Sequence, residues 1–352
     1  MKVLVLGGTG AMGMHLVQML ANNEIETFVT SRKVQSSEKN IHYIQGNAHD
    51  MEFLLTVLPE RWDAIVDFMV YSTSDFKDRV NVLLNATSQY IFLSSARVYA
   101  DSEQPITENS PRLLDVSRDM DFLSTDEYSL AKARQEDILK NSGRNNWTII
   151  RPYITYSEDR LQLGVLEKEE WLYRALKGRT IVFSVDINSK LTTLTYGYDV
   201  SRGIMAVIGN IKTLGETYHI TTNESISWYK VCEIYLNVLE KHLGRKPKVI
   251  LQNLNDFIEC KPAEFQIKYD RLFSRQFDNS KIVQYFNTDS FVKPEIGIER
   301  CLVEFLESPQ FERINWKLEA LKDRQTKEHT SFREISGIKH KLKYLLFRYL
   351  CR

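Results

Sequence analysis

The stretch LVLGGTGAMG, residues 4–13, decides the fold of this chain. Its apolar start predicts a buried strand, and the helical spacing of apolar residues over 12–21 predicts an amphipathic helix directly afterwards. Between them, Gly7 permits a tight turn, Gly10 lets the backbone approach a pyrophosphate, and Gly13 allows close packing of helix on strand. A glycine turn without a ligand is the alternative. The strand–turn–helix context favours a dinucleotide-binding unit.

The first half of the chain alternates short apolar runs with helical stretches, which predicts a doubly wound parallel sheet covered on both faces. After about residue 155 charged helical segments separate isolated strands, and this predicts a smaller α/β domain interleaved with the first. We predict a dinucleotide-binding domain over 1–155, completed by parts of 190–225, a second domain over 156–330, and a basic amphipathic tail over 331–352. The expected strands are 3–6, 27–30, 41–44, 64–68, 90–93, 147–150, 180–183, 217–221 and 248–251, and the expected later helices are 166–176, 228–242 and 300–306.

Composition excludes several classes of protein. The 352 residues carry 46 basic and 46 acidic side chains, and a net charge of zero does not suit electrostatic capture of nucleic acid by the whole chain. No apolar run reaches the roughly 18 residues of a membrane span, and the apolar start turns into glycines too soon for a secretory signal. Four widely spaced cysteines without a CxxC pair predict free thiols in a cytoplasmic protein and no metal site.

The end of the second strand bears on which dinucleotide is bound. An NAD enzyme commonly places a carboxylate there, whereas this chain offers the hydroxyl of Ser31 and the cations Arg32 and Lys33, which suit the 2′-phosphate of NADP. The alternative is that the two cations are solvated loop charges, or that Arg32 stacks on adenine. After the third strand, Asn47 is placed to hydrogen-bond adenine, and His49 is expected at the surface.

Ser95, Tyr128 and Lys132 form the candidate catalytic set. A spacing of four places Tyr128 and Lys132 on one helical face, and Ser95 follows the strand 90–93 at the expected carboxyl edge of the sheet. A phenol with an ordinary pKa of about 10 is a poor base at neutral pH, but a neighbouring ammonium and a nicotinamide ring both favour the phenolate. We therefore predict that Tyr128 shuttles a proton, that Lys132 also holds the nicotinamide ribose, and that Ser95 hydrogen-bonds the substrate oxygen.

Together these features resemble the extended short-chain dehydrogenase/reductases of the NAD-dependent epimerase/dehydratase type, over about residues 1 to 320. The resemblance implies an α/β fold with a Rossmann-like doubly wound parallel sheet and a smaller, interleaved α/β substrate domain. The matching motifs are GGTGAMG (7–13), FLSSARVY (92–99), Tyr128 with Lys132, RPY (151–153), DVSR (199–202), GETYHI (215–220) and DNSK (278–281).

The resemblance also implies roles for individual residues. Ser95 takes the family's Ser/Thr role, Tyr128 is the acid/base and Lys132 is its partner. Residues 68–70 line the cofactor groove, and Tyr153 meets the nicotinamide end. The complete set of expected cofactor-binding residues is Gly7, Thr9, Gly10, Ala11, Met12, Gly13, Ser31, Arg32, Asn47, Ala48, Phe68, Met69, Val70, Lys132 and Tyr153.

Two departures from the family pattern are informative. Sugar-nucleotide 4,6-dehydratases carry an Asp-Glu pair directly after the Ser/Thr, and here that pair is Ala96 and Arg97, so dehydratase activity is not expected. The arginine that many epimerases place on the substrate pyrophosphate aligns near Thr192. The candidates to replace it, unless they are only solvated surface charges, are Lys268, Arg271 and Arg275.

These observations predict an NAD(P)-dependent epimerase that acts on a nucleotide-activated sugar through a keto intermediate. The alternative is an NADPH-dependent reductase of a keto-sugar nucleotide; Ser31 and Arg32 favour NADP, and the family resemblance favours NAD. A non-catalytic dinucleotide- or RNA-binding scaffold is the alternative of another class, because the segment 67–72 resembles a branch with chloroplast RNA-binding members. The expected partner is a nucleotide sugar for polysaccharide biosynthesis, with no nucleic acid, and a homodimer is the expected assembly.

The tail differs from the rest of the chain. Over 337–352 it carries five lysines and arginines and no acidic residue. As a helix, the tail has an apolar stripe that either binds the anionic inner face of a membrane or packs on this protein or a second subunit. Packing on protein is the commoner arrangement for an amphipathic helix. The expected apolar stripe comprises Ile338, Leu342, Leu345, Leu346, Tyr349 and Leu350.

Overall fold

The computed structural model describes residues 1–350. The chain divides into two compact units, each assembled from three segments. The first unit comprises Met1–Thr155, Thr193–Glu224 and Arg275–Lys293. The second unit comprises Tyr156–Thr192, Ser225–Ser274 and the chain from Pro294 onward.

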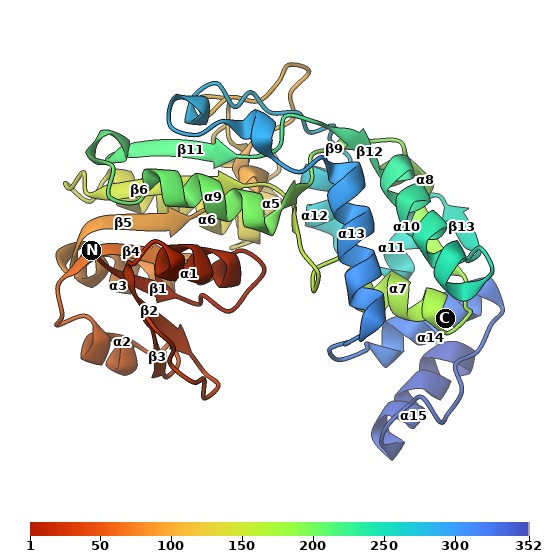
Figure 1. Cartoon of the computed structure of the whole chain (residues 1–352). Coiled ribbons are helices and arrows are strands. Elements are labelled where there is room, and N and C mark those ends of the chain that lie inside the picture. The colour runs from red at the N-terminus through yellow and green to blue at the C-terminus, as the bar shows by residue number, and fades with distance from the viewer. Residues whose placement is uncertain (351–352) are drawn as a thin grey trace. The chain divides into compact units, whose positions relative to one another are not determined.

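The first unit is built on a seven-stranded sheet in the order β11-β6-β5-β4-β1-β2-β3, with every neighbouring pair parallel (Figure 1). The six strands expected in the first half are confirmed, and 217–221, expected among the isolated strands, forms the edge strand beside β6. Periodicity shows that a segment is a strand but not which sheet it joins. The strands are β1 (Lys2–Leu6), β2 (Glu26–Ser31), β3 (Ile41–Gln45), β4 (Trp62–Asp67), β5 (Thr87–Leu93), β6 (Trp147–Pro152) and β11 (Glu216–Ile220).

Helices cover both faces of this sheet, because each central strand is apolar on both sides. Val3 and Val5 of β1 belong to one apolar core and Leu4 and Leu6 to the other. The first core is closed by α1 (Gly13–Asn22) and α9 (Gly197–Val207), and the second by α2 (Met51–Val57), α3 (Thr73–Asn85) and α6 (Tyr128–Lys140). Shorter elements of this part are η1 (Ala96–Val98), α4 (Leu113–Val116), α5 (Met120–Leu123), β10 (Thr195–Tyr196), η2 (Ile211–Thr213), η4 (Ile282–Gln284) and η5 (Thr288–Ser290). The strand β7 (Thr155–Tyr156) includes the last residue of the first segment of this unit and the first residue of the second unit.

The second unit is mainly helical. The expected helices 166–176 and 228–242 are confirmed, and 300–306 is the second half of a longer helix that opens at Pro294, a residue preorganised for the first helical position. Two small sheets pair β8 with β13 and β9 with β12. The elements are α7 (Lys168–Leu176), β8 (Ile181–Ser184), α8 (Val185–Asn188), β9 (Leu191–Thr192), β12 (Ile226–Ser227), α10 (Trp228–Leu243), β13 (Val249–Gln252), α11 (Leu254–Cys260), α12 (Glu264–Gln266), η3 (Ile267–Arg271), α13 (Pro294–Glu307), α14 (Trp316–Thr326), α15 (Ile338–Leu345) and η6 (Leu346–Leu350).

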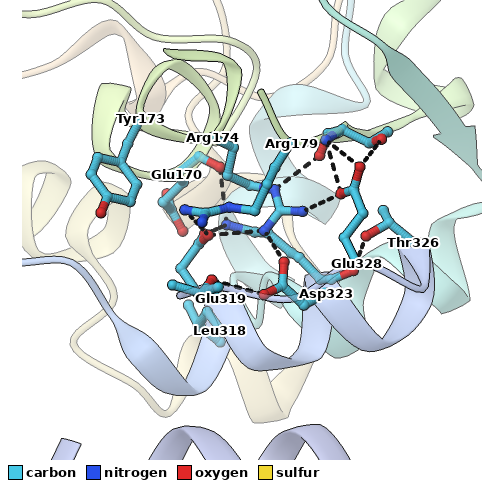
Figure 2. Close-up of polar contacts among 12 residues, drawn as sticks. Glu170, Tyr173, Arg174, Arg179, Leu318, Glu319, Asp323, Thr326 and Glu328 are labelled. Carbon is cyan, nitrogen blue, oxygen red and sulfur yellow. Dashed lines mark hydrogen bonds and ion pairs between the residues drawn. The ribbon is translucent and has the colours of Figure 1, made fainter. Parts of the chain in front are cut away.

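A buried charged cluster ties α7 to α14 within the second unit (Figure 2). The guanidinium of Arg174, 0% exposed, donates to Glu319 at 2.9 Å and to Asp323 at 2.8 Å. It also donates to Glu328 at 3.1 Å, and Glu328 in turn accepts the backbone N–H of Thr180. A buried guanidinium needs such partners, because desolvating an unpaired charge is costly.

Removing one carboxylate of this cluster should therefore destabilise the second unit. Burial alone would raise the pKa of Asp323, but Arg174 and the Tyr344 hydroxyl hold it below its ordinary value. We expect Asp323→Ala to lower the free energy of unfolding by about 3 kcal/mol at neutral pH, because Arg174 loses a buried partner. Urea unfolding followed by tryptophan fluorescence measures the change.

Exposed Asp78 on α3 provides the matched control, and Asp78→Ala should stay within about 0.5 kcal/mol of the parent. A carboxylate with a lowered pKa stabilises the folded state above its unfolded pKa, and this stabilisation is lost as the pH falls through the folded value. The difference between parent and Asp323→Ala should thus shrink in acid. A cost equal to that of Asp78→Ala at neutral pH would contradict this account of the cluster.

Candidate functional site

The glycine turn after β1 is shaped for close approach. Gly7 has a φ of 70°, and a Cβ there would lie 2.7 Å from the Sδ of Met69. A Cβ on Gly13 would lie 2.6 Å from the Cα of Gly8, so the start of α1 packs directly on the backbone of the turn. Around Gly10, by contrast, no described atom lies within 4 Å of a Cβ position. The turn is therefore tightly packed at Gly7 and Gly13. The space beside Gly10 is open, and a phosphate group of a ligand would approach the backbone there.

The N-terminus of α1 faces this opening without a side-chain cap, and the N–H of Met14 donates to the carbonyl of Gly10 at 3.1 Å. Among the described residues, no side chain accepts a hydrogen bond from this end of the helix, and its first turn carries no acidic residue. Thr9 and Gly10 are exposed, and Ala11 and Met12 are half-buried. Uncapped N–H groups at the positive end of a helix dipole form a favourable site for a phosphate group. The residues present therefore fit a dinucleotide pyrophosphate.

The end of β2 combines a buried hydroxyl with exposed cations. The hydroxyl of Ser31 donates to the carbonyl of Lys33 at 2.9 Å and accepts the N–H of Lys33 at 3.2 Å, so it closes the local turn. Arg32 and Lys33 are exposed, and within residues 1–350 no hydrogen bond or ion pair holds the Arg32 guanidinium. After β3, Asn47 is exposed and Ala48 is buried.

The ammonium of Lys132 lies at the carboxyl ends of β4 and β5. It is 2% exposed and donates to the carbonyl of Leu93 at 2.7 Å and to that of Met69 at 3.5 Å. Burial lowers the pKa of Lys132 to about 8, against the carboxylates of Asp67 and Glu136, which raise it. A lysine with such a pKa changes its charge close to neutral pH.

Tyr128 is the first residue of α6, one helical turn before Lys132. The carboxylate of Glu127 forms an ion pair with Arg97 at 2.6 Å. The Arg97 guanidinium lies 5.1 Å from the centre of the Tyr128 ring. Ser95, which follows β5, is buried, and its hydroxyl accepts the N–H of Arg97 at 3.2 Å. The three predicted catalytic residues thus come from the end of β5 and from one face of α6.

The buried carboxylate Asp67 at the end of β4 is a site residue that the sequence motifs did not predict. It accepts the hydroxyl of Tyr90 at 2.7 Å, the N–H of Met69 at 2.9 Å and the hydroxyl of Tyr71 at 3.4 Å. Burial raises its pKa, while these hydrogen bonds and the charge of Lys132 act in the opposite direction. Asp67 thereby fixes the Met69 peptide in the expected cofactor groove, where Phe68 and Met69 are half-buried and Val70 is 56% exposed. The signal available in the sequence was a carboxylate directly after the apolar run 64–66.

A second buried network holds α6 from the β6 side. Glu136 accepts two hydrogen bonds from Arg151, at 2.8 and 2.6 Å, and one from the hydroxyl of Ser94 at 2.6 Å. Burial would raise the pKa of Glu136, but Arg151 and Ser94 hold it below its ordinary value. Tyr153, two residues after Arg151, is buried, and its ring centroid lies 5.3 Å from that of Phe277. The RPY segment therefore anchors the helix that carries Tyr128 and Lys132.

The three cations expected at a substrate pyrophosphate differ in their surroundings. Arg271 is buried and ion-paired with Asp270 in the second unit. Arg275 is buried in the first unit and donates to the carbonyl of Ala100 at 2.7 Å. Lys268 is exposed, with its ammonium 5.0 Å from the centre of the Tyr269 ring. Arg271 and Arg275 are thus buried with structural contacts, whereas Lys268 is an exposed residue.

Solved structures share this architecture. Epimerase Mth375 from Methanothermobacter thermautotrophicus is 18% identical, with a TM-score of 0.65, and the alignment covers 87% of this chain and 92% of that one. UDP-glucuronic acid 4-epimerase from Bacillus cereus, in complex with UDP-glucuronic acid and NAD, is 17% identical, with a TM-score of 0.63 and coverage of 87% and 99%. WbmH from Bordetella bronchiseptica, in complex with NAD+, is 14% identical, with a TM-score of 0.66 and coverage of 88% and 99%. At these identities the likeness shows the fold.

No curated protein matches the sequence. The sequence model of the NAD dependent epimerase/dehydratase family matches residues 3–221, more than half of the chain. The matched segment runs from β1 to the end of β11 and contains the glycine turn, Ser95, Tyr128 and Lys132. With its Rossmann-like parallel sheet, the chain therefore belongs to the NAD-dependent epimerase/dehydratase family, of the extended short-chain dehydrogenase/reductase type.

Proposed function

We propose that this chain is an NAD(P)-dependent epimerase that acts on a nucleotide-activated sugar through a keto intermediate. The observation that carries the proposal is the gathering, at the carboxyl edge of one parallel sheet, of the open glycine turn, Ser95 and the α6 face with Tyr128 and Lys132. Open α/β sheets bind their ligands at this edge. The Bacillus cereus epimerase, solved with a UDP-sugar and NAD, supports the same class of substrate.

The first unit offers a continuous set of contacts for the dinucleotide. The backbone around Gly10 and the uncapped end of α1 would hold the pyrophosphate, and Lys132 would donate to the nicotinamide ribose. Met69, fixed by Asp67, would line the groove beside the ring. When bound, the nicotinamide supplies a reversible hydride acceptor for a carbon of the sugar.

Tyr128, Ser95 and Lys132 would handle the proton and the charge. As the sugar carbon loses its hydride, Tyr128 takes the proton of the hydroxyl on that carbon, which becomes a carbonyl. The hydroxyl of Ser95 donates to this oxygen, and the charge of Lys132 favours the phenolate. Once the keto sugar has rotated and its carbon regains a hydride on the other face, Tyr128 would return the proton to the oxygen.

Elimination of water is disfavoured by the residues beside Ser95. A 4,6-dehydratase of this family uses an acid and a base at these two positions. Ala96 has no titratable group, and the Arg97 guanidinium is ion-paired with Glu127. This pairing leaves Tyr128 as the residue that moves a proton and favours epimerisation over dehydration.

A reductase of a keto-sugar nucleotide is the second candidate, and it is favoured by the exposed Arg32 and Lys33. An NADP-type cation pair where NAD enzymes place a carboxylate suits an enzyme that consumes NADPH. A panel of UDP-, GDP-, CDP- and dTDP-sugars with product analysis separates the candidates. An epimer formed without net consumption of cofactor supports the epimerase, stoichiometric oxidation of NADPH by a keto sugar supports the reductase, and dinucleotide binding without any turnover supports a non-catalytic scaffold.

Tyr128→Phe should lower kcat by at least about a hundredfold, because it removes the proton-transferring hydroxyl and keeps the ring. Cofactor affinity, measured by fluorescence titration, should stay close to that of the parent. Tyr229→Phe, an exposed tyrosine of α10, is the matched control and should leave kcat unchanged. Near-normal turnover in Tyr128→Phe would reject the assignment of this residue.

Lys132→Met should lower kcat and also weaken cofactor binding, because the ammonium has a role in each. In the parent, cofactor affinity should fall as the pH rises through about 8, where Lys132 loses its proton. The dissociation constant of Lys132→Met should lack this dependence. Lys77→Met, an exposed lysine of α3, should bind like the parent. A pH dependence that persists in Lys132→Met would assign it to another group.

Arg32→Asp should weaken NADP binding much more than NAD binding, changing the ratio of the two dissociation constants by more than about tenfold, since a charge-assisted contact to the 2′-phosphate is lost. Isothermal titration with each dinucleotide measures the ratio. Arg61→Asp, at an exposed site that follows α2, has the same charge change and should not alter it. Equal weakening of both dinucleotides by Arg32→Asp would leave Arg32 without a role in cofactor choice.

A further inference from the structure

The C-terminal helix, which comprises α15 and η6, has two unlike faces. Its inner face carries Tyr344, 2% exposed, and the half-buried Phe347. Both pack with an apolar cluster that includes Tyr173 of α7 and Trp316 of α14. One face of the tail therefore packs on its own chain. Packing on protein was one of the two alternatives that the sequence left open for this helix.

Polar contacts fix this helix in place. The hydroxyl of Tyr344 donates to Asp323 at 2.6 Å and accepts the N–H of Thr330 at 2.8 Å. Arg348 donates to the carbonyl of Glu328 at 3.1 Å. Because Asp323 also belongs to the buried Arg174 cluster (Figure 2), the inner face is held by the core of the second unit. The opposite face is presented by a helix that is already formed.

The opposite face is an exposed apolar stripe. In α15, helical spacing places Ile338 and Leu342 on the side away from Tyr344, and the following π-helical turn η6 adds further exposed apolar side chains. Single exposed apolar side chains are ordinary on protein surfaces, but a contiguous row on one helix face marks an interaction surface. This outer stripe comprises Ile338 (77% exposed), Leu342 (61%), Leu346 (43%), Tyr349 (63%) and Leu350 (77%).

Exposed cations lie along one edge of the outer stripe. Lys339 and Lys343 are exposed on one side of the row, whereas Arg348 is half-buried and held by the carbonyl of Glu328. No acidic residue follows Glu334 in the sequence, although the whole chain is neutral. Cys351 and Arg352, which complete the expected tail, lie outside the described residues. An apolar row bordered by exposed lysines is typical of a helix that lies in an anionic membrane surface.

The charge pattern distinguishes a bilayer from a protein partner. Lysine is depleted at protein–protein interfaces, and a symmetric contact between two copies would bring two identical basic stripes together. Lipid phosphates, in contrast, would pair with the lysines while the aliphatic side chains enter the acyl boundary. No helix within residues 1–350 is long and apolar enough to cross a membrane. We propose that the outer stripe docks the protein on the surface of an anionic lipid bilayer.

Co-sedimentation with lipid vesicles tests the proposal on the full chain and requires no enzymatic activity. The protein should pellet with vesicles of phosphatidylcholine mixed with phosphatidylglycerol, should pellet much less with phosphatidylcholine alone, and should be released by salt. The double substitution Leu342→Asp and Leu346→Asp should weaken vesicle binding by at least about tenfold, because two inserting side chains become charged. Both residues are exposed, so circular dichroism should match that of the parent.

Two further variants sharpen the test. Ile296→Asp on α13 alters an equally exposed apolar residue of the same unit, 60% exposed, and should bind vesicles like the parent. Lys339→Glu with Lys343→Glu should weaken binding by at least about fivefold for each cation lost, the factor that corresponds to the electrostatic contribution of one lysine near such a surface. The effect should be confined to vesicles that contain phosphatidylglycerol.

Equal pelleting with both vesicle types, or binding that survives Leu342→Asp and Leu346→Asp, would overturn the proposal. Analytical ultracentrifugation of the same variant identifies the other occupant. A parent dimer that becomes a monomer, without any vesicle binding by the parent, would assign the outer stripe to a subunit interface instead.

Discussion

The buried ammonium of Lys132 is the constraint on which the first unit depends. A desolvated charge is tolerated only with hydrogen-bond partners, and here the partners are the carbonyl oxygens of Leu93 and Met69, with the carboxylate of Asp67 in its electrostatic surroundings. This requirement sets where β4 and β5 end relative to each other and which face of α6 meets them. The position of Tyr128, one turn earlier on the same helix, follows directly.

Buried ion pairs position helices in both units. In the first unit Arg151 and Glu136 anchor α6 to β6, and in the second Arg174 anchors α7 to α14 through Asp323 and its neighbours. Such pairs add little net stability compared with apolar packing of similar volume, but breaking one leaves an uncompensated charge. The first network supports the helix of the proposed catalytic residues, and the second supports the helix that presents the outer stripe.

The surroundings of Tyr128 bear on the chemistry open to this family member. Arg97 lies over the Tyr128 ring and is ion-paired with Glu127, so the positions where dehydratases carry an acid and a base are taken by Ala96 and a structural cation. The hydride chemistry shared by the family needs neither group. With Tyr128 as the proposed proton-transferring residue, such a site would favour reversible oxidation of a sugar over elimination.

The sequence by itself determined the parallel sheet, the glycine turn and the spacing of Tyr128 and Lys132, because these depend on local periodicity and on short-range backbone requirements. Only the tertiary structure placed β11 at the edge of the main sheet, gave Arg271 and Arg275 their buried contacts, and brought Asp67 to the Met69 peptide. Each of these arrangements depends on segments that are distant in sequence. The amino-acid type alone does not show whether a charged side chain is buried or solvated. Burial and partners, which no periodicity encodes, decide which charges are structural and which remain available for a ligand.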